Sequence, residues 1–343
     1  MKYVKQVIGQ LEKCYALSTL QYRGQRCLLV AAEKHDPCHL YSDSGILLDT
    51  VWDEPGGVMT MTPVPGREGV FMATQAFYSP NDCKDARLVL AEDTGDSWRV
   101  TKLCDLPGVH RFGILSRGGV DYVIACTLKS NHEYRDDWRF PGKIWVGVLP
   151  EGREPLRLTP LKEGLLRNHG FTLLPQDGYA AAIISCEDGI LRVDPPAQAG
   201  GDWAVTRLVD QPASDTICRD LDGDGVPELF VLSPFHGDEF TVWRWTNGAY
   251  KRVYTHPEKL PFLHAIDSGE FYGEPVVLIG NREGRQELLA VYYDRSAESY
   301  RFEVVDAGRG PTNCMIFHRD GHPAILAANR ETNEVAIYDV FPS

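Results

Sequence analysis

The chain has 343 residues, of which 43% are hydrophobic, 24% charged and 10% aromatic, a composition that excludes disordered, collagen-like and coiled-coil proteins. The formal net charge is -13, which disfavours nucleic acid as a partner. Residues 1–13 lack the apolar stretch of a signal peptide, and no segment approaches the ~18 apolar residues of a membrane span. We therefore expect a cytoplasmic protein that does not enter a membrane.

Short apolar runs, many of them rich in β-branched residues, alternate along the chain with clusters of Gly, Asp and Pro. No segment keeps apolar residues at helical spacing over a useful length, so the pattern predicts an all-β protein. In chain order, the seven clearest predicted strands lie within residues 27–32, 70–73, 122–126, 179–184, 228–232, 275–279 and 323–327.

Each of these runs follows a turn that contains glycine or aspartate, as expected for a β-hairpin. The turn glycines are Gly24, Gly69, Gly119, Gly178, Gly225, Gly273 and Gly321. Successive members are 45 to 59 residues apart, which fits one four-stranded antiparallel blade per step. The spacing predicts a seven-bladed β-propeller that forms a single domain over residues 1–343.

The last repeat has room for only three strands, at about 314–318, 323–328 and 334–340. Residues 2–10 precede the first full repeat and can supply the missing outer strand. Pairing of the two ends of the chain in one blade would also remove an open sheet edge. We therefore expect the last blade to be closed by the N-terminal strand.

One hairpin turn differs from the others because carboxylates and glycines alternate in it, from Asp220 to Glu228. Oxygen ligands on alternate residues allow a short loop to surround a hard cation. The turn resembles the calcium-binding loop of FG-GAP and VCBS-type propeller repeats. We predict one structural Ca²⁺ bound by Asp220, Asp222, Asp224 and Glu228, the alternative being an acidic turn without metal.

Histidines stand at the predicted start of three inner strands, at His110, His169 and His264. Inner strands converge on the propeller axis, so these imidazoles can form one face of a divalent-metal site and leave positions open for water or substrate. We predict a catalytic divalent metal, Zn, Mn or Mg, at the channel mouth. The alternative is that the three side chains only bind neighbouring loops and line a wet channel.

The loops that open on the same face contain many titratable and aromatic residues, suited to proton transfer and to sugar binding. The candidates for proton transfer are His35, His132, Lys34 and Tyr134. The candidates for substrate binding are Arg282, Arg330, Trp138 and Tyr78. Asp36 and Asp137 leave glycoside hydrolysis open as another reaction.

The histidines of the inner strands, together with His35 and the loop 132–138, are similar to the propeller of aldos-2-ulose dehydratase-like sugar lyases. This resemblance implies a metal-dependent carbohydrate lyase or dehydratase that carries out β-elimination or enolisation of a keto-sugar, keto-glycoside or uronate. A small carbohydrate is then the expected partner. The alternative is a non-catalytic propeller that binds a glycan or a protein.

Overall fold

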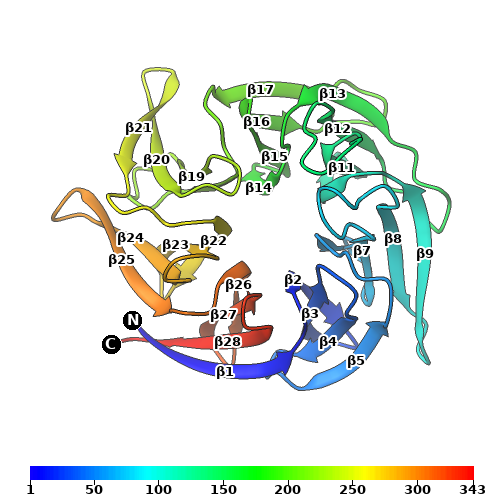
Figure 1. The fold of residues 1–343 in the computed structure, drawn as a ribbon, viewed down its shortest axis with the longest axis horizontal. Coiled ribbons are helices and arrows are strands. Elements are labelled where there is room, and N and C mark those ends of the chain that lie inside the picture. The colour runs from blue at the N-terminus through cyan, green and yellow to red at the C-terminus, as the bar shows by residue number, and fades with distance from the viewer.

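The computed structural model describes all 343 residues as a ring of seven four-stranded antiparallel sheets, with no helix. Figure 1 shows the seven blades arranged around a central axis. This architecture confirms the predicted seven-bladed β-propeller. No helix is present that could cross a membrane.

Each blade begins at the axis and ends at the rim. The innermost strands are β2 (Cys14–Tyr22), β6 (Met61–Pro63), β10 (Val109–Arg117), β14 (Gly170–Gln176), β18 (Asp215–Arg219), β22 (Leu263–Phe271) and β26 (Pro311–Arg319). The second strands are β3 (Gln25–Ala32), β7 (Val70–Gln75), β11 (Val120–Lys129), β15 (Tyr179–Cys186), β19 (Glu228–Ser233), β23 (Glu274–Asn281) and β27 (His322–Asn329). These second strands contain the seven apolar runs predicted from the sequence.

The outer half of each blade is more exposed. The third strands are β4 (Cys38–Ser42), β8 (Arg87–Asp93), β12 (Pro141–Val148), β16 (Gly189–Asp194), β20 (Glu239–Thr246), β24 (Leu288–Asp294) and β28 (Glu334–Phe341). The outermost strands are β5 (Leu47–Trp52), β9 (Trp98–Asp105), β13 (Thr159–Leu165), β17 (Ala204–Val209), β21 (Ala249–Thr255), β25 (Ser299–Asp306) and β1 (Lys2–Gln10). We number the blades 1 to 7 by their inner strands, in chain order.

The ring closes as predicted, because β1 pairs antiparallel with β28 from Lys2 opposite Phe341 to Gln10 opposite Glu334. Both ends of the chain therefore lie in blade 7 (Figure 1). The hairpin between β2 and β3 illustrates the repeated turn, since Arg23 and Gly24 both have positive φ, at 49° and 80°. This is the backbone geometry that a two-residue hairpin requires, and glycine adopts it without strain.

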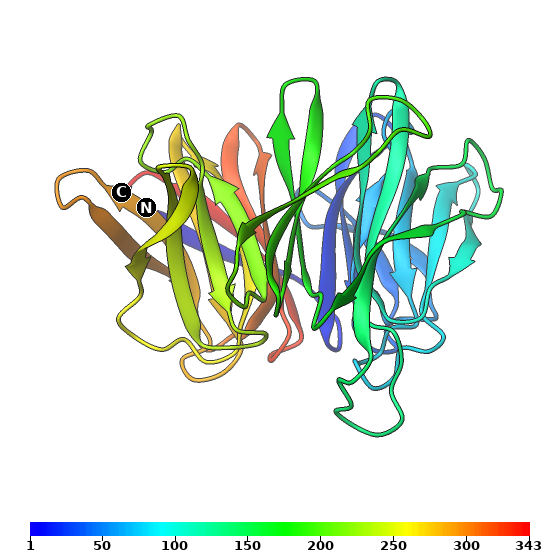
Figure 2. The ribbon, with the colours of Figure 1, turned by 90° about the horizontal axis from the view of Figure 1, so that it is seen from above.

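The hydrophobic core lies between the faces of neighbouring blades. The second strands are almost completely buried, as in β19, where all six residues are buried. The hairpin turns between first and second strands lie on one side of the disc, together with the loops 149–158 and 195–203, and the loop 130–140 lies on the other side (Figure 2). We call these the hairpin face and the loop face.

Candidate functional site

Four inner strands share an irregularity at their second residue. In the pairing of β2, β10, β22 and β26 with the next strand, the register skips Tyr15, His110, His264 and Thr312, respectively. A β-bulge of this kind changes the direction of a side chain. His169 occupies the corresponding place just before β14, where its N–H donates to the carbonyl oxygen of Ser185. The bulges therefore explain how residues from separate blades come together near the axis.

Tyr15, His110, His169 and His264 form a compact group with His236, which comes from a loop. We call these five residues the axial cluster. The ring of His169 lies 4.5 Å from that of His110 and 5.3 Å from that of His264, measured between centroids. The hydroxyl of Tyr15 lies 3.3 Å from Nε2 of His110 and 3.2 Å from Nε2 of His264. His236, in the loop between β19 and β20, is 5.1 Å from His169 and 5.3 Å from His264.

Three members of the axial cluster have the spacing of metal ligands. His169, His236 and His264 each offer one nitrogen, and these atoms all lie within 4.8 Å of one another. His110 is outside this group of three, although its ring is adjacent to that of His169. The structure thus brings together two of the predicted histidine ligands with a third histidine that the sequence analysis did not select.

The hydrogen bonds of the axial cluster leave imidazole nitrogens free. Nδ1 of His264 lies 2.7 Å from the carbonyl oxygen of Thr312, and Nδ1 of His169 lies 2.8 Å from Oδ2 of Asp215. Such contacts fix the ring and direct the Nε2 lone pair away from them. Nε2 of His169 and Nδ1 of His110 are buried without a hydrogen-bond partner. Unpartnered buried polar atoms of this kind point to a bound ion or water.

Four members of the axial cluster, Tyr15, His110, His169 and His264, are each at most 3% exposed, whereas His236 is only half-buried. Burial holds the pKa of His110, His236 and His264 well below the ordinary value, and the neighbouring His169 adds to this effect. The three imidazoles are therefore neutral at pH 7, the form that binds a metal.

Tyr15 is the one phenol of the axial cluster, and burial raises its pKa to about 12. Its hydroxyl therefore keeps its proton at neutral pH. Because Nδ1 of His264 faces a carbonyl oxygen and carries the ring proton, Nε2 of that ring accepts a hydrogen bond from the Tyr15 hydroxyl. Nε2 of His110 can then donate to the same hydroxyl oxygen.

The sequence carried a signal for Tyr15 that a search for metal ligands overlooks. Tyr15 lies between Cys14 and Ala16 at the start of an inner strand, as His110 lies between Val109 and Arg111. A comparison of all inner-strand starts would have selected it. His236 gives no such signal, because its loop is not part of the repeated strand pattern.

The side chains of Arg111 and Asn313 lie next to the axial cluster in the central channel of the propeller. Nη2 of Arg111 in blade 3 donates to Oδ1 of Asn313 in blade 7 at 3.3 Å. Nδ2 of Asn313 donates to the carbonyl oxygen of Tyr15 at 2.8 Å, and the guanidinium of Arg111 lies over the Tyr15 ring at 5.6 Å. Hydrogen bonds thus cross the ring between blades that are not neighbours.

The structure brings the two predicted substrate-binding arginines together. Glu331 accepts from Arg282 at 2.6 Å and from Arg330 at 3.0 Å, and Arg330 also donates to Glu33. The guanidinium of Arg282 lies 4.3 Å from the centroid of Phe262, whose ring contacts His236 at 4.6 Å. Both arginines are already paired with carboxylates, so an anionic substrate would have to replace Glu331.

Three further predicted residues meet in the loops of blades 1 and 2. The ring of His35 lies 4.8 Å from that of Tyr78, and Lys34 donates from Nζ to the carbonyl oxygen of Tyr78. Lys34 also lies 3.8 Å from Glu33. No hydrogen bond joins His35, Lys34 or Tyr78 to the axial cluster.

The loop 130–140 holds the remaining predicted residues in different environments. His132 borders a cavity of about 200 Å³, whereas Tyr134 is 57% exposed. Trp138 packs against the core of blades 1 to 3. Nζ of Lys129 and the guanidinium of Arg167 lie 4.2 Å and 5.1 Å from its ring centroid, so cations already occupy positions over the ring where a sugar would stack.

The two carboxylates considered for glycoside hydrolysis each have a structural partner. Asp36 accepts the backbone N–H of Glu12 at 2.6 Å. Asp137 is buried and accepts two bonds from the guanidinium of Arg139, which holds the pKa of Asp137 well below its usual range. The bonds from Arg139 therefore hold Asp137 as an ionised carboxylate, which cannot donate a proton to a glycosidic oxygen.

The acidic turn lies on the hairpin face, opposite the axial cluster, as its place between β18 and β19 requires. One carboxylate oxygen from each of Asp220, Asp222 and Asp224 lies within 4.8 Å of the others. Their other contacts organise the turn: Asp220 accepts the N–H groups of Gly223 and Gly225 at 2.7 Å and 2.9 Å.

Glu228, the fourth predicted calcium ligand, is not in that group of three. Its buried carboxylate accepts the N–H of Leu221 and the hydroxyl of Tyr300, both at 2.9 Å. The guanidinium of Arg244 lies 3.4 Å from Glu228 and 2.7 Å from Asp222. Arg244 thus partly neutralises the acidic turn in the structure.

Comparison with known proteins finds similarity in fold alone. No family model and no curated protein matches the chain. The Cps50 (Swd1) β-propeller domain of Myceliophteria thermophila is similar, with a TM-score of 0.63, 10% identity, and 98% of this chain and 100% of that chain covered. A structure described as "a putative 6-phosphogluconolactonase" from Bacteroides uniformis ATCC 8492 has a TM-score of 0.59 and 12% identity, with 95% and 91% covered. These similarities establish the β-propeller fold.

Proposed function

We propose that the protein binds one divalent metal ion at the axial cluster and uses it in a lyase or dehydratase reaction on a small carbohydrate. The observation that carries the proposal is the state of His169 and His264. Both rings are held through Nδ1 by an oxygen partner, and this is the arrangement typical of metal-bound histidine. The unpartnered Nε2 of His169 fits a site that receives a cation.

The proposed ligands are His169, His236 and His264, with His110 beside them. Of the three metals expected from the sequence, zinc suits this set best, because imidazole nitrogen favours zinc whereas magnesium and manganese prefer oxygen ligands. A bound zinc ion would supply Lewis acidity to a carbonyl or hydroxyl oxygen of the substrate.

The chain's own residues would hold and move the protons. A zinc ion on Nε2 of His264 would replace the hydrogen bond from Tyr15, whose hydroxyl keeps its proton and would then be free to donate a hydrogen bond or a proton. His35 and His132 remain the proposed bases, with Lys34 as the competing choice, and Tyr134 is the proposed proton donor to the departing oxygen. These four residues lie in loops on the same face as the axial cluster but do not contact it. The loops would therefore have to move to bring them to a bound substrate.

Zinc titration of metal-free protein, followed by calorimetry, tests the metal site. We expect one equivalent to bind, and we expect His169→Ala, His236→Ala and His264→Ala to weaken binding more than His110→Ala does. Asp215→Ala should weaken it about 10- to 100-fold through the loss of the contact to His169. Exposed His318 supplies the control, His318→Ala, which should bind zinc normally.

Elimination is then assayed with zinc-loaded protein on 3-keto-glycosides, 2-keto-glycosides and uronates, by absorbance of the unsaturated product. No zinc binding, or full elimination activity after exhaustive chelation, contradicts the proposed mechanism.

A second candidate is a non-catalytic propeller that binds a glycan or a protein, with the axial cluster as a closed plug of the channel. The near-complete burial of Tyr15, His110, His169 and His264 favours it, because a substrate needs access to the metal. Stoichiometric zinc without turnover on any substrate of the panel would support this second candidate.

A further inference from the structure

The chain enters the inner strands of five blades through the same backbone turn. Positive φ, between 48° and 77°, occurs two residues before Tyr15 and two residues before its counterparts His110, His169, His264 and Thr312. The residues with this conformation are Lys13, Gly108, Arg167, Phe262 and Gly310. Glycine adopts positive φ without strain, whereas a bulky residue does so rarely, and such strained residues cluster at functional sites. Phe262, with φ of 58°, is the one aromatic residue of this set, so the contacts of its ring indicate what the strain serves.

The ring of Phe262 lies against His236 of the axial cluster. The two centroids are 4.6 Å apart and the ring planes differ by 32°. Phe235 also stacks on His236, at 3.9 Å and 22°. Two rings so close and so nearly parallel cannot share one face of an imidazole, so His236 lies between them. The centroid of Phe262 is also 6.3 Å from that of His264 and 4.3 Å from the guanidinium of Arg282.

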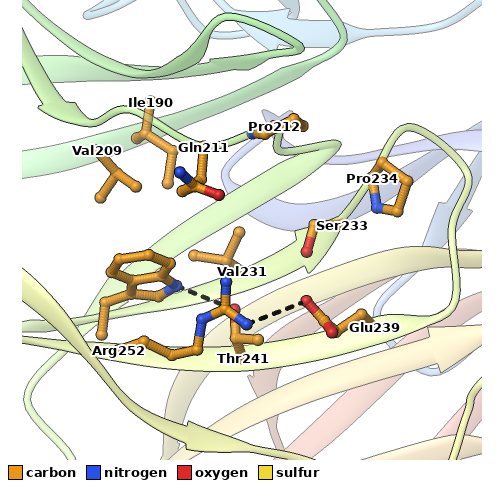
Figure 3. Close-up of a pocket in the computed structure, with 11 residues that line it drawn as sticks. Ile190, Val209, Gln211, Pro212, Val231, Ser233, Pro234, Glu239, Thr241 and Arg252 are labelled. Atoms are coloured by element: carbon orange, nitrogen blue, oxygen red, sulfur yellow. Dashed lines mark hydrogen bonds and ion pairs between the residues drawn. The ribbon is translucent and has the colours of Figure 1, made fainter.

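His236 is the member of the axial cluster that solvent reaches, because the other four are each at most 3% exposed. A groove between blades 4 and 5 begins at Ser233 and Pro234, at the base of the loop that holds His236 (Figure 3). None of the residues that line this groove belongs to the axial cluster, so the groove does not lead to the imidazoles. A ligand that approaches from the loop face therefore meets the rings on either side of His236.

The two rings are held differently. Phe235 packs against the apolar core of blades 1 to 3 and contacts Trp138 at 5.4 Å and His169 at 5.2 Å. Phe262 belongs to none of the apolar clusters of the core. Movement of Phe262 therefore breaks less apolar packing than movement of Phe235 would.

We propose that Phe262 is the gate of the axial cluster. Rotation of its side chain away from His236 uncovers the imidazoles of His236 and His264 to metal ions and small molecules that arrive from the loop face. As the entrance to a metal site, the gate rests on the proposed function, but its opening needs no metal and can be measured without one.

Acylation of histidine by diethyl pyrocarbonate, followed at each residue by mass spectrometry in the presence of EDTA, measures the opening. Phe262→Ala and Phe262→Gly both remove the ring, so His236 and His264 should be acylated about tenfold faster or more, the effect of losing one aromatic and one cation–π contact. His110 packs against Phe77 and Tyr15 and should stay slow. Exposed His318 should react at the same rate in every variant.

Tyr272 supplies the matched control. It is also an aromatic residue with positive φ, at 54°, but it lies in the hairpin turn between β22 and β23. Tyr272→Gly relieves the same kind of backbone strain without uncovering the axial cluster, and its histidines should react as in the wild type. The proposal is overturned if both Phe262 variants react at wild-type rates, if Tyr272→Gly accelerates His236 and His264 equally, or if His110 accelerates as much as His264, which would indicate a general loosening of the fold.

Zinc association separates failure of the gate from failure of the proposed function. Stopped-flow mixing with zinc should show faster association in Phe262→Ala than in the wild type, by a factor similar to that for acylation. Zinc binding with equal association rates in both proteins would overturn the gate and leave the metal site standing. Absence of zinc binding in both would contradict the proposed function, and the acylation rates would then decide on the gate alone.

Discussion

Asp267 is a carboxyl group that the fold places on an inner strand without an ion-pair partner. It is partly buried in β22, and Oδ2 accepts the backbone N–H of Ile316 in the neighbouring blade at 2.6 Å. Loss of hydration raises the pKa of Asp267 from about 3.8 to about 7. Replacement by asparagine, Asp267→Asn, keeps the shape and an acceptor for Ile316 but removes the charge.

The sign of the effect follows from proton binding in the two states. Between about pH 4 and pH 7, the unfolded chain has lost the Asp267 proton and the folded chain retains it. The contribution of Asp267 to the free energy of unfolding therefore falls by about 1.4 kcal/mol per pH unit in this range and is level above pH 7. Over the whole interval between the two pKa values, Asp267 destabilises the fold by about 4 kcal/mol.

Urea unfolding of both proteins at several pH values measures this difference. From pH 5 to pH 8, the free energy of unfolding of Asp267→Asn should gain about 3 kcal/mol relative to the wild type. Asp320 is exposed in a hairpin turn, and the control Asp320→Asn should show no such gain. Stability curves of Asp267→Asn and wild type that run parallel from pH 5 to pH 8 would refute the reasoning.

Three other predictions concern the scaffold. Deletion of residues 1–10 should lower the melting temperature of the whole protein in one transition, because it leaves β28 unpaired at the rim. An unchanged melting temperature would show that β1 is not needed to close blade 7. Addition of Ca²⁺ should raise the melting temperature of the wild type but not that of Asp222→Ala. An equal response of both proteins would show that the turn from Asp220 to Glu228 does not bind Ca²⁺. Glu228→Ala should destabilise the protein by about 2–6 kcal/mol in urea, even without Ca²⁺, because the N–H of Leu221 and the hydroxyl of Tyr300 lose their buried acceptor. A loss of stability only in the presence of Ca²⁺ would contradict this.

The architecture could be predicted because each blade repeats the same local requirements. A glycine that tolerates positive φ precedes an apolar second strand in every repeat, as Gly24 precedes β3. The strand deficit of the last repeat then fixed the role of residues 2–10. These features depend on neighbours in the sequence, and the pairing of β1 with β28 is the one long-range contact that had to be inferred.

The candidate site was predictable only where it follows the repeat. His169 and His264 stand at equivalent starts of inner strands, and the structure places them together. His236 was missed because it reaches the axis through a loop, with φ of 50°, that has no counterpart in the repeat. Trp138 was expected to be free for a sugar, but the cations over its ring come from β11 and from the segment before β14, which sequence spacing does not relate to it.

The hydrogen bonds across the axis give the ring a property that a chain of paired neighbours lacks. Arg111 ties blade 3 to blade 7, and Tyr15 ties blade 1 to blades 3 and 6. In a ring held together only by contacts between neighbouring blades, one blade could detach while the others kept their contacts. Here the detachment of blade 1 also breaks contacts on the far side of the axis. Because these hydrogen bonds join opposite blades, we expect the blades to open together rather than one by one. The slowest amide hydrogen exchange should then occur at the inner strands that carry these bonds.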